Sequence, residues 1–383
     1  MYIIQIGIMH FPATYEDILK RIDKVNPVGY AKTRNFTDGD ITYLSPYISR
    51  GVISVKQVAG AMMAKGYSFS DMTKFIQELA WREFFQRTWQ YLQDDMLHDI
   101  RRSYTGTRHR LIPKAMLCAD TGIDSIDEAI NTLYKTGYMH NHLRMYVASI
   151  ACNIGKAYWQ MPSQWMYYHL LDGDIASNAC SWQWVAGSFS SKQYYCNQEN
   201  INKYTYSTQR NTFLDEPYDA LPKMDIPMEL RPVSSFNAKT NLPERKEINI
   251  DPSLPLFIYN SYNLDPLWRK DEQANRVLLL EPWHFRQFPV SDKVIQFILD
   301  LAKNIDGLQV FVGEVSEIPQ LKKIKNIYSK EHPAFSHYPG RKDERDWLFP
   351  EVKGNFNSFF AFWKKCEQSL IKKDSLQLSL INA

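Results

Sequence analysis

The sequence has few cysteines, and none of them stand at the spacing of a metal site. The five residues Cys118, Cys152, Cys180, Cys196 and Cys366 are odd in number and widely separated, and no CxxC pair occurs. A scattered, odd set is not the pattern of a disulfide framework, and zinc or iron–sulfur sites need closely spaced ligands. We therefore expect no metal site and a protein of the reducing cytoplasm.

Long hydrophobic runs and a strong charge imbalance are also absent. No apolar run approaches the roughly 20 residues that a membrane span requires. Residues Met1–His10 are apolar but have neither a basic start nor a small-residue cleavage site, so they predict a buried strand and not a signal peptide. The net charge is +3, too small for a global field that would attract nucleic acid, so any basic surface must be local. We expect a monomer that does not contact membranes.

Aromatic residues, in contrast, are abundant. They make up 14% of the 383 residues and include 10 Trp and 23 Tyr. Such side chains fill cores, but they also suit a protein that stacks on bases or on a flat cofactor. The length allows two domains, each with its own core.

The first half of the chain has a helical pattern. Between Tyr30 and Tyr206 strand-like alternation is nearly absent, and Gly-containing turns separate the apolar segments. Apolar residues recur at helical spacing in Ser70–Leu92, Asp124–Tyr134 and Met139–Ile154. We predict helices over these three segments.

The second half changes character twice. Seven prolines between Glu216 and Pro255, without sustained periodicity, predict a linker or an extended strap. After them, short apolar runs predict four strands, at Leu256–Tyr259, Val277–Leu280, Leu308–Val312 and Ile324–Tyr328. A helix capped by Ser291 falls between them, and alternation of strands and helices predicts a parallel sheet. We expect a late helix, Phe356–Leu370, to close this domain.

These patterns predict a mainly α protein in which an all-helical domain precedes a smaller α/β domain. The expected parts are an N-terminal extension (1–29), the helical domain (30–215), the Pro-rich linker or strap (216–255) and the α/β domain (256–383).

Three helical segments gather polar and aromatic groups. Glu78, Trp81 and Arg82 stand at i, i+3 and i+4, and Asn141, Arg144 and Met145 repeat that spacing, so each set projects from one helix face. The segment 171–184 holds two carboxylates, an Asn and two Trp. Each also has an ordinary interpretation: a core edge with an extended Arg, a helix-start turn, or core packing.

In their order and spacing, the segments resemble the helical FAD domain of cryptochromes and photolyases. The resemblance rests on Tyr43–Gly51 (YLSPYISRG), Glu78–Phe85, Thr121-Gly122, Thr136–Asn141 and Asp172–Trp184. It covers residues from about Tyr30 to Tyr195, under half of the chain, and its motifs are long and ordered. It implies an all-helical FAD-binding fold with FAD as cofactor.

The resemblance assigns cofactor roles to matching positions. Thr42 and Ser45 match hydroxyl donors to the FAD pyrophosphate, where a turn opening a helix offers free N–H groups. Asp174 matches the acceptor for flavin N3–H, Arg144 and Asp172 match an ion pair beside the flavin ring, and Asn178 matches the residue facing N5. The cofactor-binding set implied in this way is Tyr30, Thr42, Leu44, Ser45, Arg82, Arg144, Asp172, Asp174 and Asn178.

The substrate implied is DNA containing a cyclobutane pyrimidine dimer, which the enzyme must extrude from the duplex. Trp81 and Trp184 match the aromatic walls, Glu78 and Asn141 the groups that bind the pyrimidine edges, and Met145 a packing residue. Relatives that repair (6-4) photoproducts place histidines where Asn141 and Met145 stand, which favours the cyclobutane substrate. His142 occupies a position where many relatives have an Arg that contacts DNA phosphate.

The mechanism implied is light-driven electron transfer from reduced FAD to the dimer, so that the protein supplies proximity, orientation and a dry pocket. Family members also reduce the flavin through a tryptophan relay. Trp182 and Trp159 match its first two members; the third position falls in Thr105-Gly106, where Tyr104 is a candidate substitute. The alternative is that Trp159 is only a core residue. Cys180, between Asn178 and Trp182, replaces a small residue.

One local basic stretch could contact phosphates. Residues 101–114 hold five Lys or Arg and no acid, which fits either a solvated loop or a DNA contact. The DNA-binding candidates are Arg101, Arg102, Arg108, Arg110 and His142.

The chain departs from the family in domain order. Photolyases typically begin with an α/β antenna domain, whereas this chain reaches the flavin-domain motifs almost at its start. The later patterns RVLLLEP and LQVFVGE faintly resemble that antenna domain, so a rearranged order, a piece of a longer chain and an unrelated module all remain open, as does a second chromophore.

We consider three functions. The first is a deoxyribodipyrimidine photolyase, a carbon–carbon lyase, favoured because the whole dimer-contacting set is present. The second is a cryptochrome-like FAD blue-light photoreceptor without repair activity. The third is a helical nucleic-acid-binding protein that has lost FAD, which a yellow purified protein would exclude.

Overall fold

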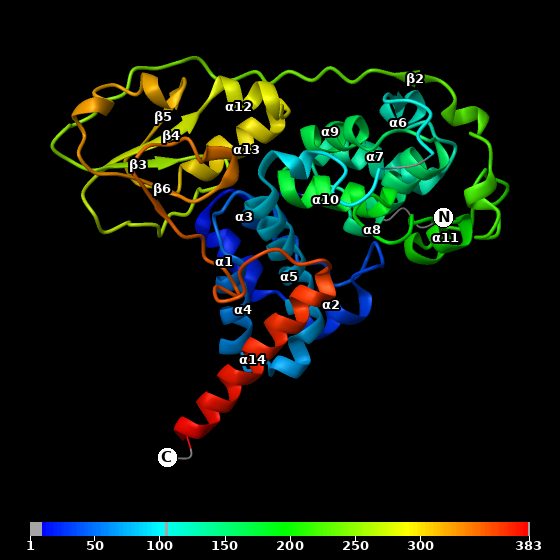
Figure 1. The fold of residues 1–383 in the computed structure, drawn as a ribbon, viewed down its shortest axis with the longest axis horizontal. Coiled ribbons are helices and arrows are strands. Elements are labelled where there is room, and N and C mark those ends of the chain that lie inside the picture. The colour runs from blue at the N-terminus through cyan, green and yellow to red at the C-terminus, as the bar shows by residue number, and fades with distance from the viewer. Residues whose placement is uncertain (1–9, 104–105, 382–383) are drawn as a thin grey trace.

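The computed structural model describes residues 10–103 and 106–381, and it combines a large helical part with a smaller part built on a sheet (Figure 1). The strand predicted for Met1–His10 lies, apart from His10, outside the described residues. The α-helices of the first part are α1 (Tyr15–Asp23), α2 (Pro27–Thr33), α3 (Ser45–Ser49), α4 (Val55–Ala64), α5 (Phe69–Leu92), α6 (Lys114–Cys118), α7 (Asp124–Thr136), α8 (Asn141–Ala148), α9 (Gln160–His169), α10 (Ile175–Ala186) and α11 (Gln198–Thr205).

Helix α5 is the central helix of this part, and the sequence determines where it begins. Ser68 caps it by accepting from the Asp71 N–H, while the Asp71 side chain accepts from the Ser68 N–H. Phe75, Ile76 and Phe84 are buried on its inner side. The prediction of a helix over Ser70–Leu92 is confirmed.

The predictions for α7 and α8 are also confirmed, with one difference. The segment Met139–Ile154 forms α8 only as far as Ala148 and continues as a π-helix over Ser149–Ile154. Every residue of that π-helical turn is buried. Periodicity of 3.6 residues cannot signal the extra residue of a π turn, which is why the sequence predicts one uniform helix.

The later residues form a five-stranded parallel sheet, seen on the left in Figure 1. Its strands are β3 (Leu256–Tyr259), β4 (Asn275–Leu280), β5 (Leu308–Val312), β6 (Ile327–Lys330) and β7 (Arg341–Asp343), in the spatial order β5-β4-β3-β6-β7. Leu256 pairs with Asn275 on one side and with Ile327 on the other, so β3 is central. The sheet's helices are α12 (Pro282–Gln287) and α13 (Asp292–Ala302).

The expected fold class, mainly α with a smaller α/β part, is confirmed. The predicted strand Ile324–Tyr328 begins three residues too early, because Ile324 closes a 3₁₀ turn before β6 begins. None of the helices in the described part of the chain is both long and apolar enough to cross a bilayer.

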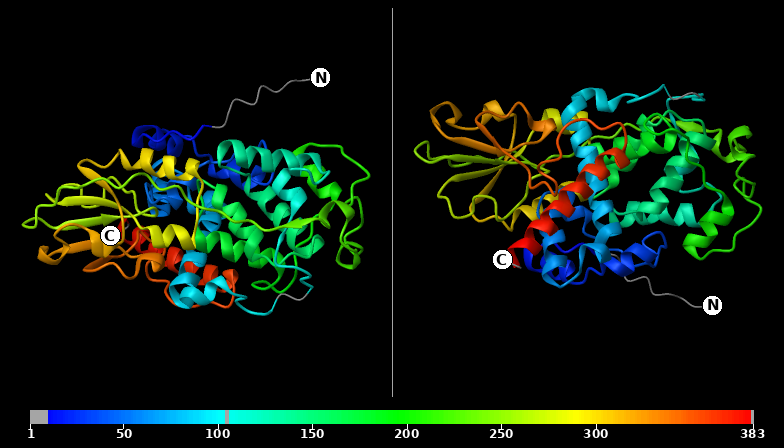
Figure 2. Two further views of the ribbon diagram at one scale, coloured as in Figure 1. Left: turned by 90° about the horizontal axis from the view of Figure 1, so that it is seen from above. Right: turned by 60° about the horizontal axis from the view of Figure 1, so that its bottom comes forward.

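The Pro-rich residues 216–255 run in extended form along the outside of the molecule from the helical part to the sheet, as Figures 1 and 2 show. Within this segment, β2 (Val233–Ser234) pairs with β1 (Ile112–Pro113) in a short antiparallel contact.

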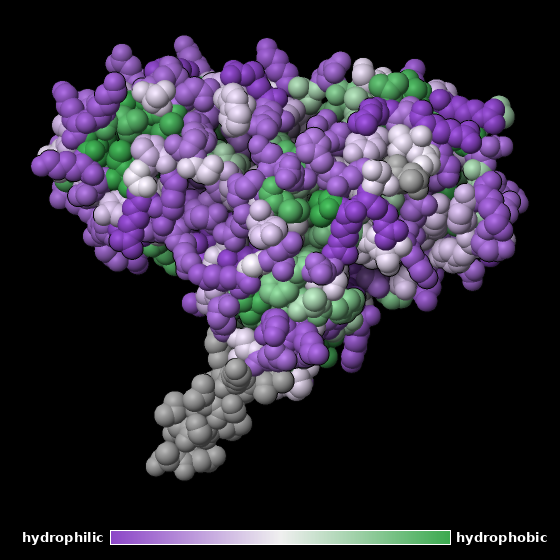
Figure 3. Space-filling model, viewed as in Figure 1, coloured by the Kyte–Doolittle hydropathy of each residue, from purple (hydrophilic) through white to green (hydrophobic). Residues whose placement is uncertain are grey.

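The last helix is the main correction to the predicted fold. Helix α14 (Phe359–Ile381) does not close the α/β part but packs on α5 (Figure 2, right). Phe359 and Phe362 are fully buried against Phe84 of α5. In the view of Figure 3, hydrophobic residues gather where α14 meets the helical part.

Candidate functional site

Two carboxylates at the start of α10 form the centre of the candidate site. Asp172 and Asp174 are 7% and 2% exposed. Asp174 caps α10 by accepting from the Ser177 N–H at 2.7 Å. The preceding turn lies against Gly137, where an added Cβ would come within 2.7 Å of the Leu171 side chain. The Gly137 position, with φ of +75°, therefore allows the α7–α8 turn to approach the carboxylates closely.

Asp174 is held by two side chains of α5. Arg82 Nη1 donates to Oδ2 at 3.2 Å, and Gln86 Nε2 donates to Oδ1 at 2.7 Å. Burial alone would raise the pKa of Asp174, but Arg82 and the Ser177 N–H outweigh it, and the pKa lies below its usual value. The carboxylate is therefore ionised.

Asp172 has a free oxygen. Its Oδ2 accepts from Arg144 Nη2 at 2.9 Å and from Ser45 Oγ at 2.6 Å, so the expected Arg144–Asp172 ion pair is present. Its Oδ1 is buried and has no partner among the described residues. A buried acceptor without a donor costs about 1–3 kcal/mol, so this position suits a ligand that brings an N–H or O–H group.

The other expected cofactor residues surround this centre. In the turn before α3, Thr42 Oγ1 accepts a hydrogen bond from the Leu44 N–H. The residue Leu44 is itself buried, at 1% exposed. Tyr30 packs edge-on against Phe75 with ring centroids 5.3 Å apart, and burial raises its pKa. Asn178 Nδ2 donates to the Ser163 carbonyl at 2.9 Å, which fixes the amide and leaves Oδ1 as the end that can accept a hydrogen bond.

The expected dimer-contacting residues differ in exposure and in their partners. Glu78 forms ion pairs with Arg34 at 3.3 Å and with Lys74 at 2.9 Å. Asn141 begins α8 and is exposed, whereas Met145, one turn later, is half-buried against the core.

The two expected aromatic walls differ. Trp184 is half-buried beside Tyr194, with ring centroids 5.8 Å apart. Trp81 is stacked face to face on Phe359 of α14, at 3.7 Å and 9° between planes. One face of Trp81 is thus covered by the chain itself, an arrangement that the sequence pattern did not predict.

Trp182 and Trp159, the expected relay residues, are both 2% exposed. Trp159 Nε1 donates to Asp99 at 2.8 Å, and the neighbouring Tyr158 hydroxyl donates to the same carboxylate at 3.0 Å. Tyr104, the candidate third member, lies outside the described residues. Tyr158 is half-buried, and its ring centroid lies 5.8 Å from that of Trp159.

The arginines expected to contact DNA, Arg101, Arg102, Arg108 and Arg110, are all exposed. Arg110 lies over the Tyr158 ring at 4.4 Å, and Arg108 is 3.9 Å from Asp225.

His142 differs from these arginines. Its ring packs on Tyr146 and Tyr204, and burial, assisted by Arg34, lowers its pKa to about 4. At neutral pH this ring is uncharged, which argues against the expected phosphate contact.

Three residues at this site have no counterpart among the sequence expectations. Gln86 follows Arg82 by one helical turn, so helix spacing could have indicated it. Arg345 donates to Gln86 from a segment 259 residues later, and Phe359 covers Trp81 from α14. The aromatic run FFAFW was a visible signal of packing, but nothing in it named the partner helix.

Comparison with known proteins shows a similarity that covers much of the helical part. Residues 75–213 match the family model described as the FAD binding domain of DNA photolyase. Residues 75–213 are therefore similar to the FAD-binding domain of photolyases and cryptochromes. This photolyase-type part contains α5, α8 and α10, which carry most of the expected site, and the family model names the cofactor that the sequence predicts.

Curated relatives and solved structures give the extent of the photolyase-type likeness. The deoxyribodipyrimidine photo-lyase of Synechococcus sp. is 33% identical over 169 residues, 42% of this chain and 35% of that protein. The enzyme of the same name from Agrobacterium fabrum is 32% identical over 166 residues, with the same two shares. The chain thus spans about a third of the length of these relatives. The crystal structure of a Synechocystis cryptochrome has a TM-score of 0.46 at 21% identity and covers 52% of this chain and 44% of that one.

Proposed function

We propose that this protein binds FAD in its helical part and uses light to split cyclobutane pyrimidine dimers in DNA. The observation that carries the proposal is the buried Asp172, whose Oδ1 has no donor while Arg144 and Ser45 hold its other oxygen. A photolyase-type chain with such an acceptor, beside an ionised Asp174, has the donor and acceptor set that a flavin ring requires.

The residues proposed to hold FAD are Tyr30, Thr42, Leu44, Ser45, Arg82, Arg144, Asp172, Asp174 and Asn178. Bound FAD would supply the photoexcited electron that opens the dimer. The protein's own contribution is electrostatic and steric: Arg144 keeps a full ion pair in a buried place, and Asn178 presents a neutral acceptor that does not repel a reduced, negatively charged ring.

The residues proposed to bind the extruded dimer are Glu78, Trp81, Asn141, Met145 and Trp184. Stacking on an aromatic wall contributes about 1–3 kcal/mol per base. Because Phe359 covers one face of Trp81, we infer that α14 must move, or that the dimer uses the other face of Trp81. The exposed arginines 101, 102, 108 and 110 would contact the DNA backbone.

A blue-light photoreceptor without repair activity is the second candidate. The observation that favours it is the same stacked pair, because a wall residue covered by the chain's own Phe359 is less accessible to DNA. Both candidate functions require bound FAD, so only a measurement of dimer repair distinguishes them.

The first test is cofactor uptake. We expect wild-type protein to take up FAD and turn yellow, and Asp172→Asn to bind FAD at least about tenfold more weakly, since the ion pair with Arg144 is lost. The exposed Asp120 provides a control, Asp120→Asn, that should bind as wild type. A colourless wild-type protein that cannot be reconstituted with FAD would refute both candidates.

The second part of the test is repair. Reduced holoprotein is mixed with an oligonucleotide containing a thymine dimer, with and without near-UV or blue light. Loss of the dimer only in light supports the photolyase, and an intact dimer with bound FAD supports the photoreceptor. Glu78→Ala should lower repair while FAD stays bound; loss of FAD in this variant would mean that the α5 face was assigned wrongly.

A further inference from the structure

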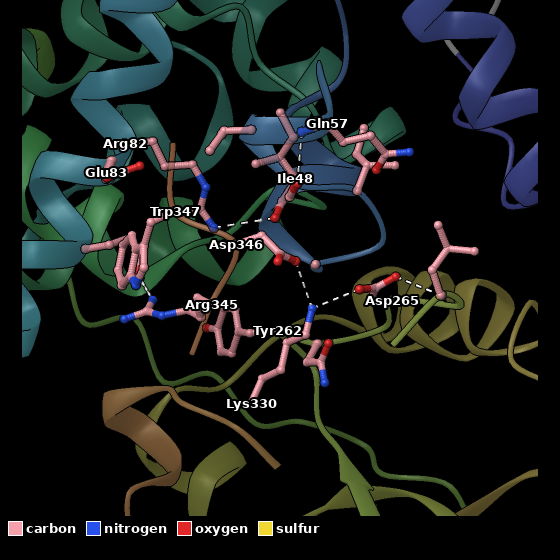
Figure 4. A pocket seen from close by; sticks show the side chains of 17 residues that line it. Ile48, Gln57, Arg82, Glu83, Tyr262, Asp265, Lys330, Arg345, Asp346 and Trp347 are labelled. Atoms are coloured by element: carbon pink, nitrogen blue, oxygen red, sulfur yellow. Dashed lines mark hydrogen bonds and ion pairs between the residues drawn. The ribbon is translucent and has the colours of Figure 1, made fainter. Parts of the chain in front are cut away.

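Arg345 connects the last part of the chain to the carboxylate Asp174. It lies two residues after β7, in the segment that leads to α14, and so outside residues 75–213 that match the family model. Arg82, Gln86 and Arg345 line a cavity of about 440 Å³ beside the sheet, and Figure 4 shows Arg82 and Arg345 in its wall.

The connection to Asp174 runs through the side chain of Gln86, which is 3% exposed. Gln86 Oε1 accepts a hydrogen bond from Arg345 Nη1. Gln86 Nε2 donates to both oxygens of Asp174, at 2.7 and 2.8 Å. One buried amide therefore joins the guanidinium group of Arg345 to the carboxylate.

The two neighbours of Gln86 leave its amide only one satisfactory orientation. A guanidinium group has only donors, and an ionised carboxylate has only acceptors. The amide oxygen must therefore face Arg345, and the amide nitrogen must face Asp174. The reversed amide would place two donors together and two acceptors together, so that both contacts would be lost.

Arg345 is itself held in place from several sides, and its side chain is 17% exposed. Its Nε donates to Glu331 at 2.9 Å, and Glu331 also accepts from Gln90 of α5 at 2.9 Å. The guanidinium group lies over the Trp347 ring at 4.4 Å, which favours a cation. Arg345 is thus a fixed donor against which the Gln86 amide is set.

The position of Asp174 depends on this donor. Without Arg345, the Oε1 atom of Gln86 would be a buried acceptor that has lost its donor. Buried polar groups are normally satisfied, so the amide would regain a partner only by turning away from Asp174. Asp174 would then keep Arg82 and the Ser177 N–H but lose both contacts from Gln86.

We propose that Arg345 is a positioning residue of the flavin site, which fixes Asp174 for its contact with the cofactor by orienting the Gln86 amide. The proposal rests on the proposed role of Asp174 toward flavin N3–H. It gives the segment between β7 and α14 a share in holding the cofactor.

A double-mutant cycle on FAD affinity, measured by fluorescence titration, tests this role. We expect Gln86→Leu and Arg345→Met to weaken FAD binding by about tenfold and about fivefold. The double variant should bind no more weakly than Gln86→Leu alone, because Arg345 then has no amide to orient. Arg341→Met removes an arginine of β7 whose side chain is 76% exposed, and it should bind FAD as wild type.

Two results of the cycle would overturn the proposal. One is unchanged FAD affinity in Arg345→Met when Asp174→Asn weakens binding, which refutes the positioning role alone. The other is a loss of about fiftyfold in the double variant, since multiplied losses would show that Arg345 acts independently of Gln86. A protein that binds no FAD at all would refute the proposed function and the positioning role together.

The orientation of the amide is measured separately in FAD-free protein, by NMR of the Gln86 side-chain NH₂ group. In wild type we expect two distinct proton signals that exchange slowly with water, because Nε2 is bound to Asp174. Exchange should be at least about tenfold faster in Arg345→Met, and Arg345→Lys, which keeps a charged donor, should restore part of the protection. Rapid exchange in the wild-type protein would overturn the proposal even if Arg345→Met does not fold.

Discussion

His284 is a titratable residue buried outside the flavin site. It is 1% exposed in an aromatic cluster with Tyr262, Phe285 and Phe335. Burial, and to a smaller extent Arg50, lowers its pKa to about 3. The ring is therefore neutral in the folded protein across the physiological pH range.

This lowered pKa predicts acid sensitivity. An unfolded His binds a proton near pH 6.5, whereas His284 in the folded state does not until about pH 3, so its contribution to stability is complete above pH 6.5 and is lost as pH falls toward 3. The variant His284→Phe should reduce the slope of unfolding free energy against pH by up to about 1.4 kcal/mol per pH unit between pH 6 and 4.

Urea unfolding at pH 7, 6, 5 and 4 measures this slope. His98→Gln, which changes an exposed residue, is the matched comparison. An unchanged slope in His284→Phe would show that the ring protonates freely in the folded state.

At the same scale, the sequence predicted some contacts and could not predict others. The Arg144–Asp172 pair was expected because the resemblance to the photolyase FAD domain assigns both partners. The contact of Asp174 with Gln86 could have been found from helix spacing, but the link from Gln86 to Arg345 could not, because it joins segments 259 residues apart. Local patterns carry no information on which distant segment completes a buried network.

Among the elements, α14 has the largest consequence for the site. Phe359 is 2% exposed and stacked on Trp81, whereas its neighbour Phe360 is 69% exposed. Substituting each of these adjacent residues therefore distinguishes the loss of the ring that covers Trp81 from the loss of an exposed phenyl group.

We expect Phe359→Ala to destabilise the protein by about 3–5 kcal/mol, since a buried aromatic ring is removed. It should also uncover Trp81, which would shift tryptophan emission to longer wavelength and increase quenching by acrylamide. Phe360→Ala should change neither quantity appreciably. Equal effects of the two substitutions would contradict the stacking of Phe359 on Trp81.

The elements were predicted better than their arrangement. Periodicity located α5, α7, α13 and most of the sheet, because each has one apolar side or a short buried run. It could not reveal the π-helical turn at Ser149–Ile154, and it assigned α14 to the nearer domain in the sequence, although its aromatic face packs on α5. An amphipathic pattern shows that a face is covered but not by what.

For the whole molecule, the C-terminal segment is joined to the helical part through Glu83. This carboxylate is 2% exposed and accepts from the Leu348 N–H at 2.7 Å and the Phe349 N–H at 3.0 Å. Burial raises the pKa of Glu83, and these two N–H groups act in the opposite direction. One side chain of α5 thus satisfies two backbone donors on the chain that leads to α14.

Glu83→Ala should leave both donors unsatisfied and cost about 2–4 kcal/mol of unfolding free energy. Amide hydrogen exchange should then be faster at Leu348 and Phe349 than at the β3 amides, which are paired within the sheet. Glu83→Gln retains an acceptor oxygen and should lose less protection. Unchanged exchange at Leu348 in Glu83→Ala would contradict the joining role.

Arg82 lies at the boundary of two regions, because it pairs with Asp174 and also lines the cavity beside the sheet. Gln86 of the same helix also donates to Asp174 and lines that cavity, so two side chains of α5 contact both regions. By thermodynamic reciprocity, a molecule in the cavity that changes flavin affinity by some factor must have its own affinity changed by that same factor.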